Sequence, residues 1–171
     1  MEPQAIFGTS VLMGIVVWGT IAVRCLWPAL QSRPPAEALR PLLLLHAFRF
    51  VGLTFLVPGV VSPDLPAAFA RPAAYGDLTT ALLALLAVAT LGRRPATILV
   101  WLVNIVGTVD LLNAFYQADR VGIGNMPGLL GAAFFIPTVL VPLLLVTHAL
   151  AFRVLLRQQS VSESVTRARV G

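Results

Sequence analysis

Hydrophobic residues in this chain gather into five long runs separated by short polar segments. The runs cover residues 6–30, 41–61, 75–91, 95–117 and 129–157. A helix needs about 20 mostly apolar residues to cross the hydrocarbon core of a bilayer. Four runs meet this length, and the third is shorter and contains Thr79, Thr80 and Thr90. The pattern predicts an all-α integral membrane bundle, formed by a single domain over residues 1–157.

The positions of the arginines decide whether the third run crosses the membrane. With five crossings, Arg71 and Arg120 fall in the loops on one side. Eight arginines fall on the opposite side: Arg33, Arg40, Arg93, Arg94, Arg153, Arg157, Arg167 and Arg169. Short loops rich in basic residues stay in the cytoplasm. We therefore expect five transmembrane helices, with the N-terminus outside and the C-terminus cytoplasmic.

Two segments outside the runs have a distinct composition. Residues 62–76 contain three prolines, and their Leu65, Phe69 and Tyr75 suggest a stretch that lies along the interface and caps the bundle. Residues 158–171 are polar, and we expect them to form a disordered cytoplasmic tail.

The composition supports a lipid environment. Of the 171 residues, 58% are hydrophobic and 11% are charged, whereas soluble domains carry about 25% charged residues. The net charge of +5 comes from arginines at the ends of apolar runs, and a nucleic-acid binder would instead show a basic stripe on a polar surface. Every basic residue is arginine, as in proteins from GC-rich bacterial genomes. We expect a multi-pass protein of the bacterial cytoplasmic (inner) membrane, with membrane lipids and not nucleic acid as partners.

Three phrases in the sequence support a resemblance to a known group. They are HAFRFVG at 46–52, LPAAFARPAAYGD at 65–77 and NIVGTVDLLNA at 104–114. With these phrases the chain resembles an uncharacterised family of small bacterial multi-pass membrane proteins. The resemblance covers most of the membrane region and implies no activity, ligand or catalytic residue.

Motifs for catalysis are missing from the sequence. It contains no GxSxG, HExxH or P-loop motif, and the glycines of GIGNMPG at 122–128 do not follow a strand. The single cysteine, Cys25, excludes an internal disulfide and a CxxC site. We therefore name no catalytic residue, and the sequence favours a function other than an enzyme without deciding the question.

Polar side chains inside the apolar runs are the candidates for function, because a charged group in lipid costs about 2.5–3.5 kcal/mol. Arg24 and Arg153 lie near helix ends and can reach water, whereas Arg49 lies roughly 12 Å deep by helical rise. His46 and Arg49 are three residues apart and share a helix face. The candidate ligand-binding residues are His46, Arg49, Asn104, Asp110, Asn113 and His148.

Arg49 needs a partner at this depth, and the sequence offers several. Asp110 is the one acidic residue that we place between helix ends, and Asp110 or Asn104 could make a purely structural contact with Arg49. Backbone carbonyls freed near a proline are a second choice, and an anionic head group held by Arg49 and His46 is a third. For Asp77, which follows Gly76 at the expected start of a helix, an N-cap is the simplest interpretation.

Three functions follow from these residues. The first is a membrane-embedded binding or translocation protein for a lipid-like or anionic small molecule, supported by Arg49, His46 and the carbonyls freed by Pro137 and Pro142. The second is a structural or accessory subunit that binds a protein partner in a larger membrane complex. The third is a b-type haem protein with His46 and His148 as axial ligands and with Arg49 and Arg24 near the propionates. We estimate that the depths of the two histidines differ by roughly 6 Å.

Overall fold

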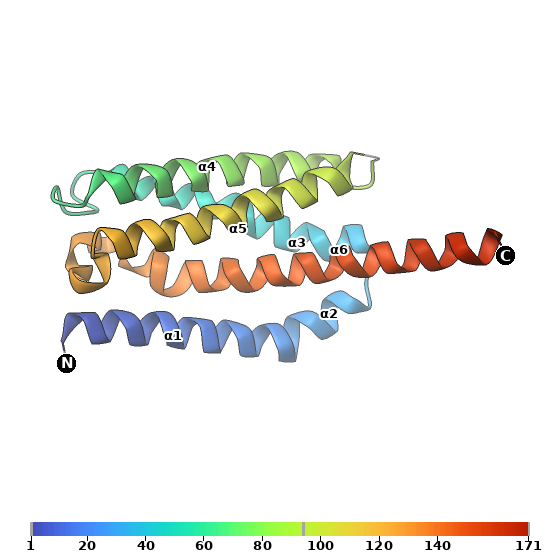
Figure 1. The fold of residues 1–171 in the computed structure, drawn as a ribbon, viewed down its shortest axis with the longest axis horizontal. Coiled ribbons are helices and arrows are strands. Elements are labelled where there is room, and N and C mark those ends of the chain that lie inside the picture. The colour runs from blue at the N-terminus through green and yellow to red at the C-terminus, as the bar shows by residue number, and fades with distance from the viewer. Residues whose placement is uncertain (1, 94, 171) are drawn as a thin grey trace.

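The chain forms an elongated bundle of helices (Figure 1). The computed structural model describes the backbone of residues 2–93 and 95–170, and side chains within these ranges as far as residue 158. These residues form helices and turns and no named strand. Five helical segments are long and apolar enough to cross a membrane: Pro3–Gln31, Pro35–Leu56, Ala67–Thr90, Ala96–Arg120 and Ile136–Gln158. The all-α prediction and the prediction of five membrane-length helices are confirmed.

Three of these segments change their helical geometry along their length. The first consists of α1 (Pro3–Ile21), the π-helical η1 (Ala22–Leu26) and α2 (Trp27–Gln31). The second joins α3 (Pro35–Ala47) to the 3₁₀ helix η2 (Phe48–Leu56), and the fifth joins the π-helical η5 (Ile136–Leu140) to α6 (Val141–Val170). Helices α4 (Ala67–Thr90) and α5 (Ala96–Arg120) are continuous, and the short 3₁₀ helices η3 (Ile123–Asn125) and η4 (Pro127–Phe134) follow α5.

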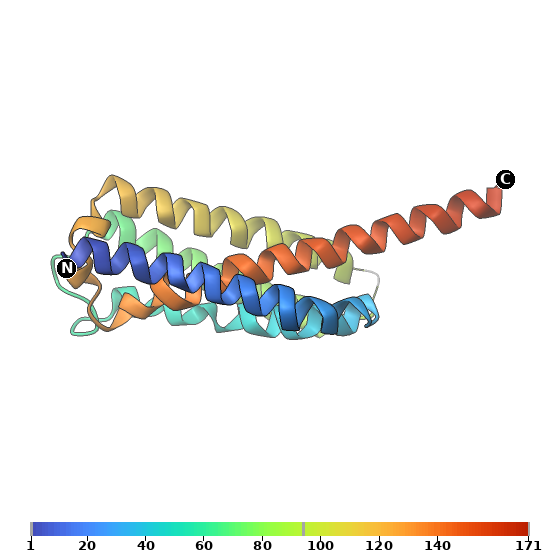
Figure 2. The same cartoon turned by 90° about the horizontal axis from the view of Figure 1, so that it is seen from below.

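The two chain ends lie at opposite ends of the bundle, because successive segments alternate in direction (Figure 1). The C-terminal part of α6 projects beyond the other helices (Figure 2). This part includes residues that we expected to form a disordered tail. Their backbone continues α6 to Val170, and no proline or glycine interrupts the sequence between Gln158 and Val170.

Prolines lie inside two helices where the sequence suggested a boundary. The second membrane-length segment begins at Pro35, so Pro41 lies within α3. Helix α4 begins at Ala67 and includes Pro72 in its second turn, where proline removes the one hydrogen bond that an N–H would make to the Ala68 carbonyl. Residues 67–76 therefore belong to a membrane-length helix and do not form the separate cap that we expected. Leu65 and Phe69 are buried in the core.

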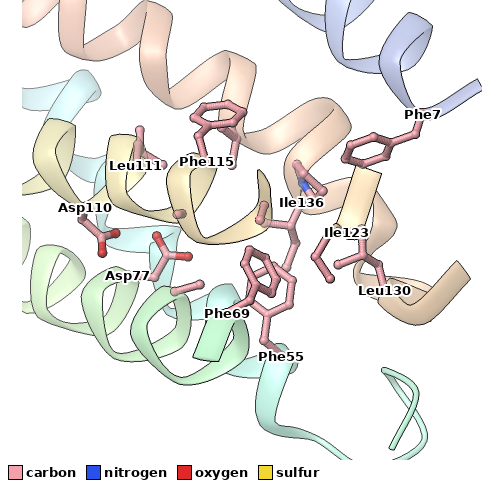
Figure 3. Close-up of a pocket in the computed structure, with 15 residues that line it drawn as sticks. Phe7, Phe55, Phe69, Asp77, Asp110, Leu111, Phe115, Ile123, Leu130 and Ile136 are labelled. Carbon is pink, nitrogen blue, oxygen red and sulfur yellow. The ribbon is translucent and has the colours of Figure 1, made fainter. Parts of the chain in front are cut away.

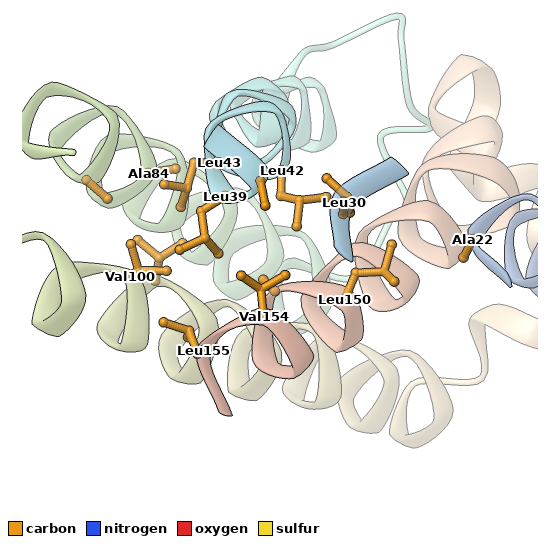
Figure 4. Close-up of a cluster of buried hydrophobic side chains, with 14 residues drawn as sticks. Ala22, Leu30, Leu39, Leu42, Leu43, Ala84, Val100, Leu150, Val154 and Leu155 are labelled. Carbon is orange, nitrogen blue, oxygen red and sulfur yellow. The ribbon is translucent and has the colours of Figure 1, made fainter. Parts of the chain in front are cut away.

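The interior contains two apolar clusters with a polar layer between them. One cluster fills the end of the bundle near the α2–α3 turn and includes Leu39, Leu43, Val100 and Leu155 (Figure 4). The other fills the opposite end and includes Phe55, Phe69, Ile123, Leu130 and Ile136. Along α3–η2, α4 and α5, the buried polar residues fall between the two clusters.

Helix α1 is peripheral. None of its residues from Pro3 to Ile21 is buried, and its contacts are mainly with η5 and α6. The Nε1 of Trp18 donates a hydrogen bond of 3.1 Å to the Val139 carbonyl of η5.

Candidate functional site: a buried arginine between two aspartates

Arg49 occupies the centre of the polar layer. It lies on η2, one turn after His46, and its side chain is 0% exposed. Its Nε lies 2.7 Å from Asp77 Oδ1 on α4, and its Nη2 lies 2.6 Å from Asp110 Oδ2 on α5. One guanidinium thus ties three membrane-length segments together. Of the partners that the sequence offered for Arg49, Asp110 makes the contact, and Asp77 is a second acidic partner.

The third nitrogen of Arg49 is also occupied. Nη1 donates to the Gly107 carbonyl at 3.1 Å and contacts His148 Nε2 at 3.3 Å. An arginine N–H can only donate, so Nε2 of His148 accepts and its Nδ1 carries the proton. That Nδ1 lies 3.0 Å from Asn104 Oδ1, and the Asn104 amide donates to the Val100 carbonyl at 2.8 Å. The network therefore extends from α4 through α5 to α6.

His46 completes the layer. Its ring stacks on His148 with a centroid distance of 3.9 Å and an interplanar angle of 25°. Its Nε2 lies 3.4 Å from Thr147 Oγ1, and that hydroxyl donates to the carbonyls of Leu143 and Leu144. Nδ1 of His46 is buried without a hydrogen-bond partner among the residues that the structure describes.

Glycines allow the helices to approach this closely. A Cβ at Gly76 would lie 1.6 Å from Asp110 Oδ1, and one at Gly52 would lie 2.1 Å from Asp77 Oδ2. A Cβ at Gly107 would lie 2.6 Å from the His148 ring and 2.9 Å from Arg49 Nη1. A small residue at such a contact lets membrane helices pack closely enough for polar groups to pair.

A cavity of about 80 Å³ lies beside the two aspartates (Figure 3). That volume holds several water-sized groups. Its walls are almost entirely apolar and include Phe7, Phe55, Phe69, Phe115 and Leu111. Asp77 and Asp110 lie at one end of this space in Figure 3. Their side chains remain 10% and 12% exposed, respectively, whereas the side chain of Arg49 is fully covered.

The two histidines do not fit as axial ligands of one haem in this arrangement. Axial imidazoles approach the iron from opposite faces of the macrocycle, which must lie between them. Here the rings contact each other face to face at 3.9 Å, and both nitrogens of His148 already contact Arg49 and Asn104. Arg24 is exposed on η1 and takes no part in the network.

Five of the six candidate residues meet at this layer: His46, Arg49, Asn104, Asp110 and His148. Asn113 is half-buried and belongs to none of the network's hydrogen bonds. Asp77 was missed because we placed the start of its helix at Tyr75 and interpreted Asp77 as an N-cap. It lies near the middle of α4. The signal was the run from Ala67 to Leu91, in which Arg71 and Asp77 are the only charges.

Comparisons with known proteins give a family and no activity. No curated protein matches the chain, and no solved structure does. A family model matches residues 6–156, which include every membrane-length helix apart from its outermost residues. This match agrees with the resemblance to an uncharacterised family that the three sequence phrases indicated. The chain therefore belongs to the family described as a domain of unknown function, DUF8737.

Proposed function

We propose that this protein is a membrane-embedded binding or translocation protein for a small lipid-like molecule. The ligand occupies the cavity with its apolar part against the phenylalanines and its polar end at Asp77 and Asp110. The observation that supports this proposal is the cavity itself, which has apolar walls and ends at two ion-paired carboxylates. Ligand pockets typically combine mainly apolar walls with a few placed polar groups.

The geometry favours a lipid-like ligand over an anion at Arg49. All three guanidinium nitrogens already have partners, two of which are carboxylates. An anion would have to displace a carboxylate that lies within 3 Å of the guanidinium, and it would then face the repulsion of both acids. Arg49 therefore organises the aspartates and does not itself contact the ligand.

The proposed location is the cytoplasmic membrane of a bacterium, with the C-terminus inside. The end of the bundle that holds the C-terminus also carries Arg33, Arg40, Arg93 and Arg157, whereas Arg71 and Arg120 lie toward the other end. Basic residues concentrate on the cytoplasmic side of membrane proteins. This distribution supports the orientation expected from the sequence.

The cavity can be tested with small aromatic amphiphiles and the full-length chain in detergent. Benzyl alcohol, benzylammonium and benzoate share one ring and differ in charge. We expect at least one of them to raise the melting temperature saturably, since a ligand that binds only the folded state stabilises it. In Ala114→Leu, which fills the cavity from α5, this shift disappears. In the control Ala149→Leu, at an exposed position on α6, the shift remains.

If none of the three probes gives a saturable shift, or if Ala114→Leu responds like the wild-type chain, the cavity is not a binding site. If a probe does bind, its uptake into proteoliposomes separates translocation from binding alone.

A second candidate is an accessory subunit of a larger membrane complex. The observation that favours it is α1, which has no buried residue and leaves a long apolar face open, including Leu12, Met13 and Val16. This role predicts a protein partner that co-purifies in near-stoichiometric amounts from native membranes. A homogeneous preparation without a partner would count against it.

A further inference from the structure

The polar end of the cavity carries more negative than positive charge. Arg49 supplies one positive charge to the two carboxylates of Asp77 and Asp110. His148 uses Nε2 as an acceptor toward Arg49, so its ring is neutral in this arrangement. His46 stacks on that ring and does not contact the aspartates in the hydrogen-bond network. With both acids ionised, the layer holds one excess negative charge, which is costly at membrane depth without a counter-charge.

Each aspartate also has an oxygen without a donor. Arg49 binds Oδ1 of Asp77 and Oδ2 of Asp110. Among the described residues, nothing donates a hydrogen bond to Oδ2 of Asp77 or to Oδ1 of Asp110. Asp77 is only 7% exposed and lines the cavity. Asp77 Oδ2 packs beside Gly52 and Asp110 Oδ1 beside Gly76. Part of each carboxylate side chain remains exposed, so each aspartate can still accept a hydrogen bond from a donor that enters from the cavity.

The apolar walls are suited to a cation. Phe7, Phe55, Phe69 and Phe115 line the space beside the acids. The face of an aromatic ring attracts an ammonium group, most strongly where water is excluded. A carboxylate pair and several phenylalanines would repel an anion and would discriminate little between neutral molecules.

From these three observations we propose that the cavity binds a small amphiphilic organic cation, an ammonium group with an apolar substituent. The ammonium group lies at Asp77 and Asp110, where it supplies both the missing charge and the missing hydrogen-bond donors. The substituent packs among the phenylalanines. This inference rests on the proposed function and assigns the chemical class of its ligand.

The test compares benzylammonium with benzyl alcohol and benzoate, using dissociation constants for the full-length chain in detergent at neutral pH. We expect benzylammonium to bind at least about tenfold more tightly than benzyl alcohol, which corresponds to about 1.4 kcal/mol. Benzoate should bind more weakly than both. The proposal is overturned if benzyl alcohol or benzoate binds as tightly as benzylammonium. If no probe binds, the proposed function fails as well, so the two failures are distinct.

A variant locates the source of the preference. Asp110→Asn removes one negative charge and keeps the shape of the side chain, so the tenfold preference for benzylammonium over benzyl alcohol should fall to about twofold or less. Asp119→Asn, on the exposed surface at the end of the same helix, should keep the full preference. Because the wild-type comparison needs no variant, a folding defect in Asp110→Asn leaves the proposal testable. An unchanged preference in a folded Asp110→Asn protein would place the cation elsewhere.

Discussion

At the scale of single residues, Arg49 determines the organisation of the bundle interior. A buried guanidinium is stable only if its lost hydration is replaced. Asp77, Asp110, the Gly107 carbonyl and His148 together provide this replacement. Removing Arg49 leaves both carboxylates without their counter-charge, so the layer depends on this one side chain.

The dependence on Arg49 leads to a prediction for stability. Arg49→Met leaves two carboxylates in the interior without their cation, and we expect the free energy of unfolding in mixed micelles to fall by about 3–5 kcal/mol. Arg120→Met is the matched control, because Arg120 is exposed and its guanidinium lies over the ring of Tyr116. The control should change the free energy of unfolding by less than about 1 kcal/mol.

Neutralising the remaining charges provides a second check on the same residue. The triple variant Arg49→Met, Asp77→Asn, Asp110→Asn contains no unpaired charge at this layer, so it should be more stable than Arg49→Met alone. Equal stability of Arg49→Met and Arg120→Met would mean that Arg49 is not paired in the folded protein.

Sequence reasoning identified most of this layer because polar residues inside apolar runs are conspicuous. It found both histidines, Arg49, Asn104 and Asp110 from depth and helical spacing. It missed Asp77 because prolines at Pro66 and Pro72 suggested that the helix starts later than Ala67. Asn113 lies in the same apolar run as Asn104 and Asp110, and a helical repeat alone cannot separate the face that meets Arg49 from its neighbour.

At the scale of elements, the contact of α1 with the bundle depends on close packing at Gly14. A Cβ at this position would lie 2.4 Å from the Thr138 carbonyl oxygen, which is backbone and cannot move freely. Trp18 adds a hydrogen bond to the Val139 carbonyl one turn further along. Both contacts join α1 to the π-helical η5, where carbonyl groups are displaced from ordinary helical pairing.

We predict that Gly14→Ala separates α1 from η5 and lowers the free energy of unfolding by about 1–3 kcal/mol. Gly8→Ala, on the same helix with nothing within 4 Å of its Cβ position, is the control. It should leave stability unchanged or raise it by up to about 1 kcal/mol, because alanine favours the helix. Urea or SDS titration of both variants measures the difference, and equal effects would contradict the packing described for α1.

Element boundaries also explain an error in the expected depth of the histidines. Counting from Pro41 placed His46 about 6 Å shallower than His148, yet the two rings stack. Helix α3 begins at Pro35, and the fifth span ends at Gln158. With a rise of 1.5 Å per residue, these bounds place both histidines about 15–17 Å from the same end. Proline at position 41 was compatible with a helix start and equally with an early helical turn, so sequence alone did not separate the two.

At the scale of the whole molecule, an odd number of spans places the two termini at opposite ends (Figure 1). Two features of the sequence predicted five spans. Each apolar run exceeds or approaches the length of a span, and with five crossings most of the loop arginines fall on one side of the membrane. The cavity and the pairing partners of Arg49 could not be predicted, because they depend on which helices are neighbours and how they are rotated.

The orientation gives a prediction for intact cells. If the arginine-rich end lies in the cytoplasm, as we propose, a tag at the C-terminus should be protected from impermeant reagents and a tag at the N-terminus should be accessible. Accessibility labelling of the two tagged proteins, with and without membrane permeabilisation, measures this directly. Two termini on the same side would contradict a five-span arrangement.

The central claim is that Arg49 is ion-paired with two aspartates inside a lipid-embedded bundle. Dipolar recoupling by solid-state NMR between arginine guanidinium nitrogens and aspartate carboxyl carbons, in lipid bilayers, tests it most directly. Among the described residues only Arg49 makes arginine–aspartate ion pairs, so we predict strong coupling to two carboxyl carbons, one lost in Asp77→Asn and the other in Asp110→Asn. Coupling to neither carboxyl carbon in the wild-type protein would contradict the account.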